Sequence, residues 1–342
     1  MQTVAFHKLT FLLVALFCLQ ILACSRGKGP PASQPDSSSS NQQNAVLGVT
    51  QPGASIAPDF LIAPSSLEQR WIVSATEALE LIDQGATLLD ARGQGLIKQK
   101  LPGAIAVNWR DFSPRAAAVR GRLLEDDAQL TQRLQALGIS QNIPVVVLGD
   151  PPRGWGEDGR IVWMLRTLGH QQAVLVDGGL RALVEEAGDT HSLSDTSTAH
   201  QPGDFVVRRD PTWSIQRDAV RSQIGSDNLV IIDTREPREF AGKTPYGEQR
   251  GGHIPGAVNL YFKDLWGEDG RLLSRQEVNV KLQALGITPD TEVIVYCTGG
   301  IRSGWVAAVL VTWGFSTQNY AGSMWEWSAA PAEQYPLAKV AP

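Results

Sequence analysis

The sequence has few cysteines and no recognisable arrangement of metal-binding residues. Its 342 residues include three cysteines, Cys18, Cys24 and Cys297. No CxxC, HExxH or comparable spacing of metal ligands occurs, and such spacings are the usual signature of zinc and iron–sulfur proteins. The sequence therefore argues against a metal-dependent function, and we expect neither a metal ion nor a cofactor.

The chain also lacks a basic patch and a long hydrophobic run. The formal net charge is −5 and no block of Lys and Arg stands out, which argues against a nucleic-acid partner. An apolar stretch runs from Leu9 to Ala23 and is interrupted only by Thr10 and Gln20. It is shorter than the roughly 20 residues that a membrane-spanning helix needs, so an export signal fits it better than a permanent anchor.

The end of this stretch carries a candidate lipidation site. The tetrapeptide ILAC (21–24) resembles the processing box of bacterial lipoproteins. The resemblance implies that residues 1–23 are a signal peptide and that Cys24 carries the lipid after cleavage. We therefore expect the protein on the periplasmic side of a bacterial membrane, lipid-anchored at Cys24. The alternative is ordinary cleavage after the small residues Ala23 and Ser25, which would give a soluble periplasmic protein.

The segment after the signal is predicted to be a disordered tether. Residues 24–60 are dominated by Ser, Pro, Gly, Gln and Asn, and a segment of this composition cannot bury enough apolar surface to order itself. A flexible chain of about 35 residues spans roughly 30–35 Å on average. This length suits a globular body held away from a membrane.

The remaining chain contains an internal repeat. GRLL occurs at 121–124 and 270–273, and LQALGI occurs at 134–139 and 282–287. In each copy these motifs follow a strand-like run ending in Asp-x-Arg and a Pro-Gly-Ala turn, and they precede a β-rich run, a helix and a short strand. We therefore divide the chain into an amino half, residues 61–200, and a carboxyl half, residues 215–342, joined by an interdomain linker at 201–214.

Both halves alternate strands with helices, which is typical of an α/β fold. We expect two tandem domains, each a mainly parallel sheet with helices on both faces. Ser74 with Glu77, and Ser274 with Glu277, form capping-box patterns at the starts of two predicted helices. The segment 303–314 is apolar nearly all round, so we predict a helix buried against the sheet.

The repeat also separates shared scaffold from candidate function. The Asp-x-Arg pattern occurs in both halves, at 90–92 and 233–235, so we interpret it mainly as a structural pair. Cys297, in contrast, aligns with Gly149, and the loops that follow these two residues differ. The chemistry is therefore predicted to lie in the carboxyl half.

Cys297 lies where nucleophilic chemistry is favoured. It is in a β-rich run, 292–298, that precedes a helix, and open α/β sheets bind their ligands at such strand ends. Gly299 and Gly300 free the backbone to point several N–H groups inward as an anion site, which favours a reactive thiolate. Arg302 opposes the dipole of the following helix, which indicates an anion nearby. The alternative is a buried core thiol with Arg302 in solvent.

The motifs of the carboxyl half resemble those of the rhodanese sulfurtransferases. In order they are DTREPREF, GGHIPGAVNL, VIVYCTGGIRSGW and YAGSMWEW. The amino half is similar but lacks the cysteine, so the chain resembles tandem-domain thiosulfate or mercaptopyruvate sulfurtransferases, whose first domain is typically inactive. The resemblance implies that Cys297 takes a sulfane sulfur as a persulfide, which a thiol or cyanide acceptor then removes.

The resemblance also implies a set of binding residues. Backbone amides of the loop are expected to hold the anionic sulfur, and the loop residues are Thr298, Gly299, Gly300, Ile301, Arg302 and Ser303. Arg302 is expected to bind an anionic donor, with Arg235 or Arg250 sharing that role. His253, in a GGHIPGA turn, is expected to be structural. Trp155, in the longer loop of the amino half, is a candidate lid.

Two departures from the family pattern bear on the sulfur donor. The loop CTGGIRS is not the Cys-Gly-Ser/Thr-Gly-Val-Thr type associated with mercaptopyruvate. Glu239 stands before Phe240, where those enzymes carry an arginine, and Arg238 and Arg250 are the nearby candidates to replace it. We therefore expect thiosulfate or another sulfane-sulfur donor.

Two other functions are compatible with this architecture. Cdc25-like phosphatases and arsenate reductases use Cys-x5-Arg, whereas Cys297 and Arg302 form Cys-x4-Arg, a smaller ring of amides that suits a single sulfur better than a phosphate. A periplasmic binding or sensing module would keep the fold without turnover. The expected partners are a small-molecule sulfur donor and acceptor, and a membrane reached through the lipid.

Overall fold

The computed structural model describes residues 66–93, 101–188 and 201–339, which all belong to one structural unit, residues 57–342. The predicted signal peptide, tether and lipidated Cys24 lie outside the described residues. Each helix in the described ranges is too short or too polar to span a bilayer.

The amino half contains a five-stranded sheet in which every strand lies parallel to its neighbours, in the order β1-β5-β4-β2-β3. The strands are β1 (Ile72–Val73), β2 (Thr87–Asp90), β3 (Ile105–Ala106), β4 (Val145–Leu148) and β5 (Ala173–Val176). The helices are α1 (Ala75–Asp83), α2 (Asp127–Ala136), α3 (Glu157–Thr167) and α4 (Gly179–Ala187), with a 3₁₀ turn η1 (Trp109–Phe112).

The carboxyl half repeats this topology with a four-stranded parallel sheet in the order β7-β6-β8-β9. The strands are β6 (Leu229–Asp233), β7 (Val258–Asn259), β8 (Glu292–Tyr296) and β9 (Thr317–Asn319). The helices are α5 (Arg217–Gln223), α6 (Pro237–Phe240), α7 (Arg275–Ala284), α8 (Ile301–Thr312) and α9 (Ser323–Ala329), with 3₁₀ turns η2 (Pro211–Trp213) and η3 (Phe262–Leu265). A single parallel bridge between Ser214 and Asn319 lies where β1 lies in the amino half.

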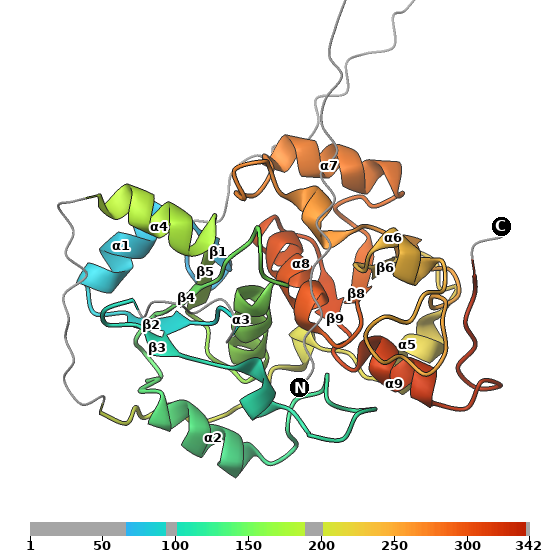
Figure 1. Ribbon diagram of the computed structural model, residues 1–342, viewed down its shortest axis with the longest axis horizontal. Helices are drawn as coiled ribbons and strands as arrows, with labels where there is room; N and C mark the ends of the chain where they lie inside the picture. Colours follow the sequence, from blue (N-terminus) through green and yellow to red (C-terminus); the bar gives the residue numbers. More distant parts are fainter. Residues whose placement is uncertain (1–65, 94–100, 189–200, 340–342) are drawn as a thin grey trace, which may run out of the picture. The chain divides into compact units, whose positions relative to one another are not determined.

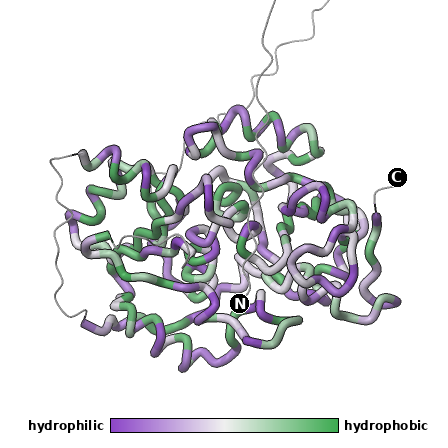
Figure 2. Tube along the Cα trace, in the orientation of Figure 1, coloured by the Kyte–Doolittle hydropathy of each residue, from purple (hydrophilic) through white to green (hydrophobic). Residues whose placement is uncertain are grey.

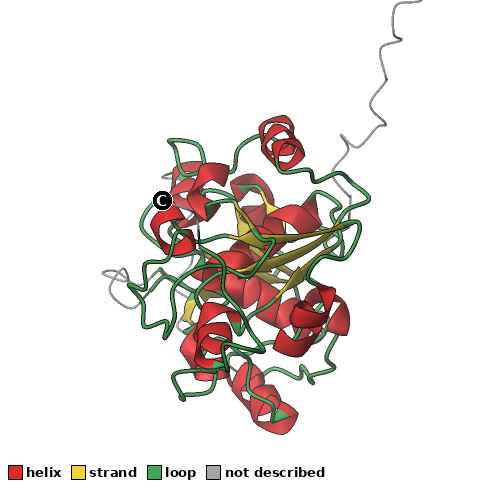
Figure 3. Cartoon of the chain, turned by 90° about the vertical axis from the view of Figure 1, so that its right-hand side faces the viewer, coloured by secondary structure: helices red, strands yellow, loops and turns green. Residues whose placement is uncertain are grey.

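Side chains of the central strands alternate between two apolar layers. In β4, Val145 and Val147 face one layer, while Val146 and Leu148 face the other. The same alternation occurs in β8, because successive side chains of a strand point to opposite faces. Both faces are therefore buried, which is why residues 145–148 and 293–296 are uninterrupted apolar runs rather than alternating with polar residues. Figure 3 shows helices on both sides of the strands. The predicted α/β fold with mainly parallel sheets is confirmed.

The predicted helix starts are present where the capping residues indicated. The Ser74 side chain accepts a hydrogen bond from the backbone of Glu77 at the start of α1. Ser274 and Glu277 form the complete reciprocal capping box of α7. Figure 2 shows hydrophobic and hydrophilic residues alternating along α7, which buries Val278 and exposes its opposite face.

The two halves share one apolar core through α3 and α8, which lie side by side in Figure 1. Every residue of α8 from Arg302 to Thr312 is buried. The prediction of a buried helix is confirmed, but α8 packs on α3 of the other half as well as on its own sheet. Glycine makes the close approach possible, since a Cβ on Gly159 would overlap the backbone of Trp305.

The predicted linker, residues 201–214, packs closely on the amino half. Its backbone bonds to the amino half at several points, including Phe205 N to Ile139 O at 3.1 Å and Arg208 N to Leu168 O at 2.9 Å. Phe205 is fully buried in the shared core. This segment is therefore held against the amino half by backbone hydrogen bonds and by burial of Phe205.

Candidate active site

Cys297 follows the last residue of β8 and lies three residues before the N-cap of α8, Gly300. Its side chain is almost completely buried. The Gly300 N–H donates to the sulfur at 3.1 Å, and the Ser303 hydroxyl donates to it at 3.5 Å. The strand end and the helix start thus place hydrogen-bond donors around one sulfur atom, as the sequence predicted.

The two glycines of the loop are required by its geometry. Gly300 has a positive φ of 81°, and a Cβ there would lie 2.5 Å from the guanidinium of Arg160. A Cβ on Gly299 would overlap the ring of Trp325. Gly299 therefore leaves room for the Trp325 ring, and Gly300 adopts a backbone conformation that residues with a side chain disfavour.

The start of α9 supports the loop from the other side. The Ser323 hydroxyl accepts the N–H of Cys297 at 3.1 Å and donates to the Tyr320 carbonyl at 2.7 Å. The N–H groups of Met324 and Trp325 donate to the carbonyls of Cys297 and Thr298 at 3.1 and 2.9 Å. Ser323 holds these contacts in a left-handed backbone conformation, with φ of 52°, which costs conformational energy in a non-glycine residue.

Arg302 lies inside the site, but its charge is already balanced. Its guanidinium forms a two-point ion pair with the Glu239 carboxylate, at 2.6 and 2.9 Å, and a 2.6 Å hydrogen bond to the Thr298 hydroxyl. Both ionic side chains are almost fully buried. Burial alone would raise the pKa of Glu239, but the contacts with Arg302 outweigh it and the pKa lies below its ordinary value. Arg302 therefore does not point to solvent.

The environment of Cys297 favours its thiolate. Burial raises the pKa of the thiol, but the charge of Arg302 and hydrogen bonds from Ser303 and Gly299 lower it by more. The net pKa lies below that of an ordinary cysteine. A lowered pKa is what makes a cysteine nucleophilic near neutral pH, so this thiol is suited to covalent chemistry.

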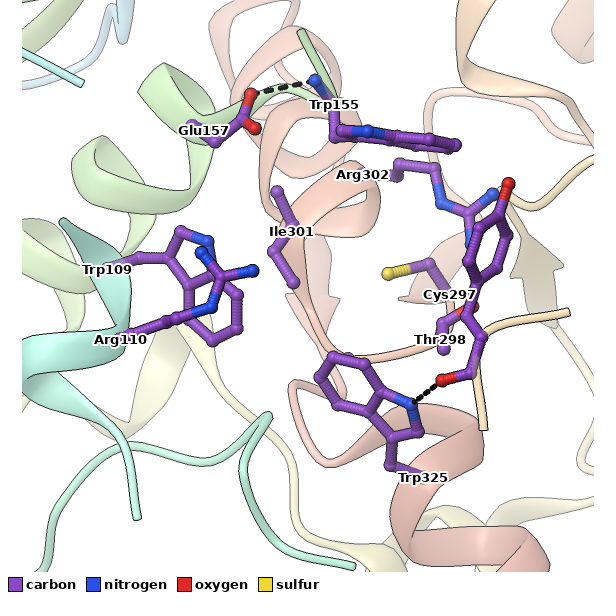
Figure 4. A pocket seen from close by; sticks show the side chains of 11 residues that line it. Trp109, Arg110, Trp155, Glu157, Cys297, Thr298, Ile301, Arg302 and Trp325 are labelled. Carbon is purple, nitrogen blue, oxygen red and sulfur yellow. Dashed lines mark hydrogen bonds between the residues drawn. The ribbon is translucent and has the colours of Figure 1, made fainter. Parts of the chain in front are cut away.

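A pocket of about 160 Å³ opens above the sulfur. Figure 4 shows the Cys297 sulfur facing an open space bordered by Ile301, Trp155 and Trp325. The lining residues come from both halves and are Trp109, Arg110, Trp155, Glu157, Tyr246, Cys297, Thr298, Gly299, Ile301, Arg302 and Trp325. The substrate space is thus largely aromatic, and the amino half supplies part of its wall.

Trp155 occupies the position expected of a lid. It is 39% exposed, lines the pocket, and meets the ring of Tyr246 edge to face at 5.3 Å across the two halves. The Arg302 guanidinium lies 5.2 Å from the Trp155 ring centroid. Trp109, Tyr246 and Trp325 also line the pocket, and the sequence interpretation assigned them no role. An aromatic residue in a loop is common, and their shared pocket appears only in three dimensions.

Comparisons with known proteins identify the family. The model of the rhodanese-like domain matches residues 74–186 and 216–330. The chain belongs to the rhodanese family. The prediction of a tandem-domain rhodanese sulfurtransferase is confirmed, and each half contains one matched region.

Relatives of the rhodanese chain extend over most of its length. The thiosulfate sulfurtransferase of Azotobacter vinelandii is 31% identical over 80% of this chain and 95% of its own. A protein of Pseudomonas aeruginosa named probable 3-mercaptopyruvate sulfurtransferase is 35% identical over 68% of this chain and 82% of its own. The crystal structure of SseA from Escherichia coli, a 3-mercaptopyruvate sulfotransferase, has a TM-score of 0.62 at 23% identity and covers 74% of this chain and 98% of that one. The structural likeness establishes a shared fold.

Two other arginines were predicted to bind the substrate, Arg235 and Arg250. In this rhodanese both form hydrogen bonds to groups of the protein. Arg235 is fully buried, paired with Asp233 at 2.6 Å and bonded to the Gly252 carbonyl at 2.7 Å. Arg250 donates to four backbone carbonyls at 2.9–3.0 Å, those of Trp327, Ser328, Ala330 and Tyr335. Neither lines the pocket. Their share in donor binding stays a prediction: both side chains bond to groups of the protein, although the Nη1 of Arg235 has no hydrogen-bond partner.

His253 also has a structural environment. Its Nδ1 lies 3.0 Å from the Phe240 carbonyl, and its ring stacks on that of Phe240 with centroids 3.7 Å apart. Its backbone pairs with Ala338 in both directions. These contacts tie the GGHIPGA turn to the chain end, which agrees with the structural role expected for it. Among the described residues, no group of three or more His, Cys, Asp or Glu is arranged to hold a metal ion.

The amino-half rhodanese domain has a different residue in the place of the thiol. Leu148 pairs with Asp90 as Tyr296 pairs with Asp233, so Gly149 is the structural equivalent of Cys297. A Cβ on Gly149 would overlap the Asp158 carboxyl group. The equivalent of the sulfur position is therefore filled by a carboxyl of the same domain.

Proposed function

We propose that this rhodanese transfers a sulfane sulfur from a donor such as thiosulfate to a thiophilic acceptor through a persulfide on Cys297. The observation that supports this most directly is the Cys297 sulfur itself. It has a lowered pKa, accepts hydrogen bonds from the loop, and borders an open pocket. A thiolate with access to a small substrate space is the requirement for nucleophilic attack on a sulfur–sulfur bond.

The reaction proceeds in two displacements. The Cys297 thiolate attacks the outer sulfur of thiosulfate, a new S–S bond forms, and sulfite leaves with the electrons of the old S–S bond. Cyanide, or a thiolate acceptor, then attacks the terminal sulfur of the persulfide and departs as thiocyanate or a new persulfide, regenerating the thiolate. Because the attacking thiolate is already formed, no separate general base is needed, and His253 lies outside the pocket lining.

The loop is built to hold the anion in both states. The Gly300 N–H and the Ser303 hydroxyl donate to the sulfur, and the α8 amino end adds its partial positive charge. Such donors need no rearrangement during the reaction, which is the basis of electrostatic preorganisation. The same groups fit a terminal persulfide sulfur after a small displacement into the pocket.

The loop sequence and Glu239 support a donor other than mercaptopyruvate. Glu239 takes both outer nitrogens of Arg302, so the guanidinium closest to the loop is committed to a carboxylate of the protein. Glu239 also stands where mercaptopyruvate-type enzymes resembling this chain carry an arginine, so the substrate carboxylate lacks that partner here. We therefore propose thiosulfate or another sulfane-sulfur donor. Steady-state rates with cyanide and each donor test the choice, and a higher kcat/KM for mercaptopyruvate would contradict it.

The decisive experiment detects the intermediate. Thiosulfate treatment of the full chain should add one sulfur of about 32 Da on Cys297, and cyanide should remove it. A protein that binds thiosulfate without gaining this mass would be the non-catalytic binding or sensing module. A protein that hydrolyses a phosphate ester instead would be the phosphatase.

We also propose the cellular arrangement of the chain. Residues 1–23 form a signal peptide, Cys24 carries the lipid, 24–60 form the tether, and the catalytic domain spans 215–342 behind a non-catalytic domain at 61–200. The ILAC box and the composition of the tether support this. Cys24→Ala should move the protein from the membrane fraction to the soluble periplasm. Cys18→Ala is the matched control, because Cys18 leaves with the signal, and a membrane-bound Cys24→Ala protein would contradict lipidation.

A further inference from the structure

Arg160 is a fully buried arginine that reaches from the amino half to the cysteine loop. It is the fourth residue of α3 and has no exposed surface. Its guanidinium donates to the Gly121 carbonyl at 2.8 Å and approaches the Gly300 carbonyl at 3.5 Å. Gly300 in turn donates its N–H to the Cys297 sulfur. One cation of the amino half therefore contacts the residue that cradles the thiol of the carboxyl half.

Glycine at the helix crossing makes this reach possible. A Cβ on Gly304 of α8 would lie 3.0 Å from the Arg160 Cα. A larger residue at this crossing would push α3 and α8 apart, and the guanidinium would move away from the loop. Trp163 and Trp109 cover the rest of the guanidinium, with centroids 4.6 and 5.9 Å from its central carbon. The position of Arg160 is thus fixed by tight packing on all sides.

Arg160 differs from Arg235 and Arg302, the two arginines paired beside the loop, in lacking a carboxylate partner. Arg235 is paired with Asp233 and Arg302 with Glu239. Arg160 forms no ion pair in the described part of the chain, although an unpaired buried charge is costly. Burial lowers the pKa of Arg160 to about 9, and the Cys297 thiolate is the charge that opposes this lowering.

Several other charged groups surround the Cys297 thiol. Arg302 comes from α8 and Glu239 from α6. Glu248 lies 3.3 Å from the Thr298 hydroxyl and 3.9 Å from Arg235. The remaining charged or titratable groups are Tyr246, Arg110 and Glu157, which line the pocket, and Arg120, whose guanidinium lies over the Trp325 ring. Asp233 with Arg235 and Glu239 with Arg302 are neutral as pairs, so the thiolate adds a negative charge that the unpaired Arg160 guanidinium opposes.

We propose that Arg160 is a positioning residue for the sulfur transfer, which orients the Gly300 peptide and balances the negative charge of the Cys297 thiolate and persulfide from the amino half. In a planar trans peptide the carbonyl and the following N–H point in opposite directions. The Gly300 carbonyl and the Ile301 N–H belong to one peptide unit. Because Arg160 holds this carbonyl on its own side, the Ile301 N–H points to the opposite side of the loop. This inference rests on the proposed function, and it gives the cysteine-free half a share in the chemistry.

The test compares Arg160 with Arg166, a matched residue on the same helix. Arg166 is also buried, and burial lowers its pKa to about 9 as well. It donates to backbone carbonyls of its own half, including Glu68 at 2.8 Å and Ala173 at 3.0 Å. Both positions thus hold a buried arginine without a carboxylate partner in the described residues, but only Arg160 contacts the loop.

Three variants of the full chain are compared with the wild type: Arg160→Met, Arg160→Gln and Arg166→Met. The rate of iodoacetamide alkylation of Cys297 is measured as a function of pH, and the midpoint of the profile reports the ionisation of the thiol. We expect the midpoint to rise by about one pH unit in both Arg160 variants, and alkylation below the midpoint to slow about tenfold. Arg166→Met should lower the thermal midpoint and leave the alkylation midpoint at the wild-type value. Folded Arg160 variants with a wild-type midpoint would overturn the proposal.

If the Arg160→Met and Arg160→Gln variants do not fold, Arg160→Lys is measured in their place. A buried lysine loses part of its charge more readily than arginine does, so the midpoint should lie above that of the wild type, and equality with the wild type would overturn the proposal. Alkylation needs no sulfur donor. A wild-type chain that alkylates normally but gains no sulfur from thiosulfate would refute the proposed function and leave the role of Arg160 to be judged by the variants.

Discussion

Asp158 and Arg302 occupy the same position in the two halves, the second residue of α3 and of α8, and they carry opposite charges. Arg302 lies at the cysteine loop, where its charge favours the thiolate. Asp158 fills the space beside Gly149, the equivalent of Cys297. The amino half therefore lacks the thiol, and it has an acidic residue where the carboxyl half has the arginine that favours the thiolate.

The Asp158 carboxyl is predicted to make stability depend on pH. Burial, together with the charges of Glu157 and Asp150, raises its pKa to about 7, against lowering by the Gly159 N–H. An acid whose folded pKa is raised stabilises the fold below its unfolded pKa, and this contribution is lost as pH rises through the folded pKa. The loss between about pH 4 and pH 7 amounts to roughly 4 kcal/mol at most, at about 1.4 kcal/mol per pKa unit.

Asp158→Asn should remove this dependence, because an amide of the same shape does not ionise. Its stability relative to the wild type should be greater at pH 8.5 than at pH 5 in urea unfolding. Asp227→Asn, at an exposed carboxylate, is the control. Equal differences at the two pH values would show that Asp158 is not the responsible group.

Cys297→Ser is predicted to abolish sulfur transfer while preserving the fold, since serine fits the space of the thiol and keeps a hydrogen-bonding group. The wild-type enzyme should give parallel double-reciprocal plots for thiosulfate and cyanide, because a covalent intermediate separates the two substrates. Intersecting lines, or a sulfur adduct on the serine variant, would rule out the persulfide route.

The buried pair of Arg302 and Glu239 should tune the thiol in opposite directions when each partner is neutralised. Glu239→Gln frees the Arg302 charge, so the alkylation midpoint of Cys297 should fall; Arg302→Gln removes that charge, so the midpoint should rise. Each change leaves one buried charge unpaired and is expected to cost about 3–5 kcal/mol of unfolding free energy. Glu277→Gln, in the capping box of the surface helix α7, controls for loss of a carboxylate. Shifts of the same sign in both variants would contradict this account.

Gly299→Ala should damage the active site through packing. Its new Cβ would overlap the Trp325 ring, and overpacking of this kind costs about 1–3 kcal/mol. Persulfide formation should slow as the loop shifts. Gly286→Ala is the contrasting variant, since it has a positive φ of 78° but open space around it. Removal of the ring should relieve the overlap, so Gly299→Ala should cost less stability in a Trp325→Ala background than in the wild type. An equal cost in both backgrounds would show that the steric explanation is wrong.

The sequence alone determined the fold class and the position of the chemistry. Periodic apolar runs and the repeat predicted two parallel α/β halves, because the alternation of strand and helix is a local pattern that neighbouring residues specify. The position of Cys297 between a strand and a helix likewise followed from adjacent residues. Its absence at Gly149 was visible because the repeat allows the two halves to be aligned.

The charges that meet at the site can be recognised only in the folded chain. Arg302 and Glu239 are 63 positions apart, and Arg160 and Gly300 are 140 apart, so no local pattern links them. Arg235 and Arg250 illustrate the same limit, since only the fold shows that neither lines the pocket. The physical reason is that the role of a charged side chain depends on its burial and on its partners, and folding brings those partners together from distant parts of the chain.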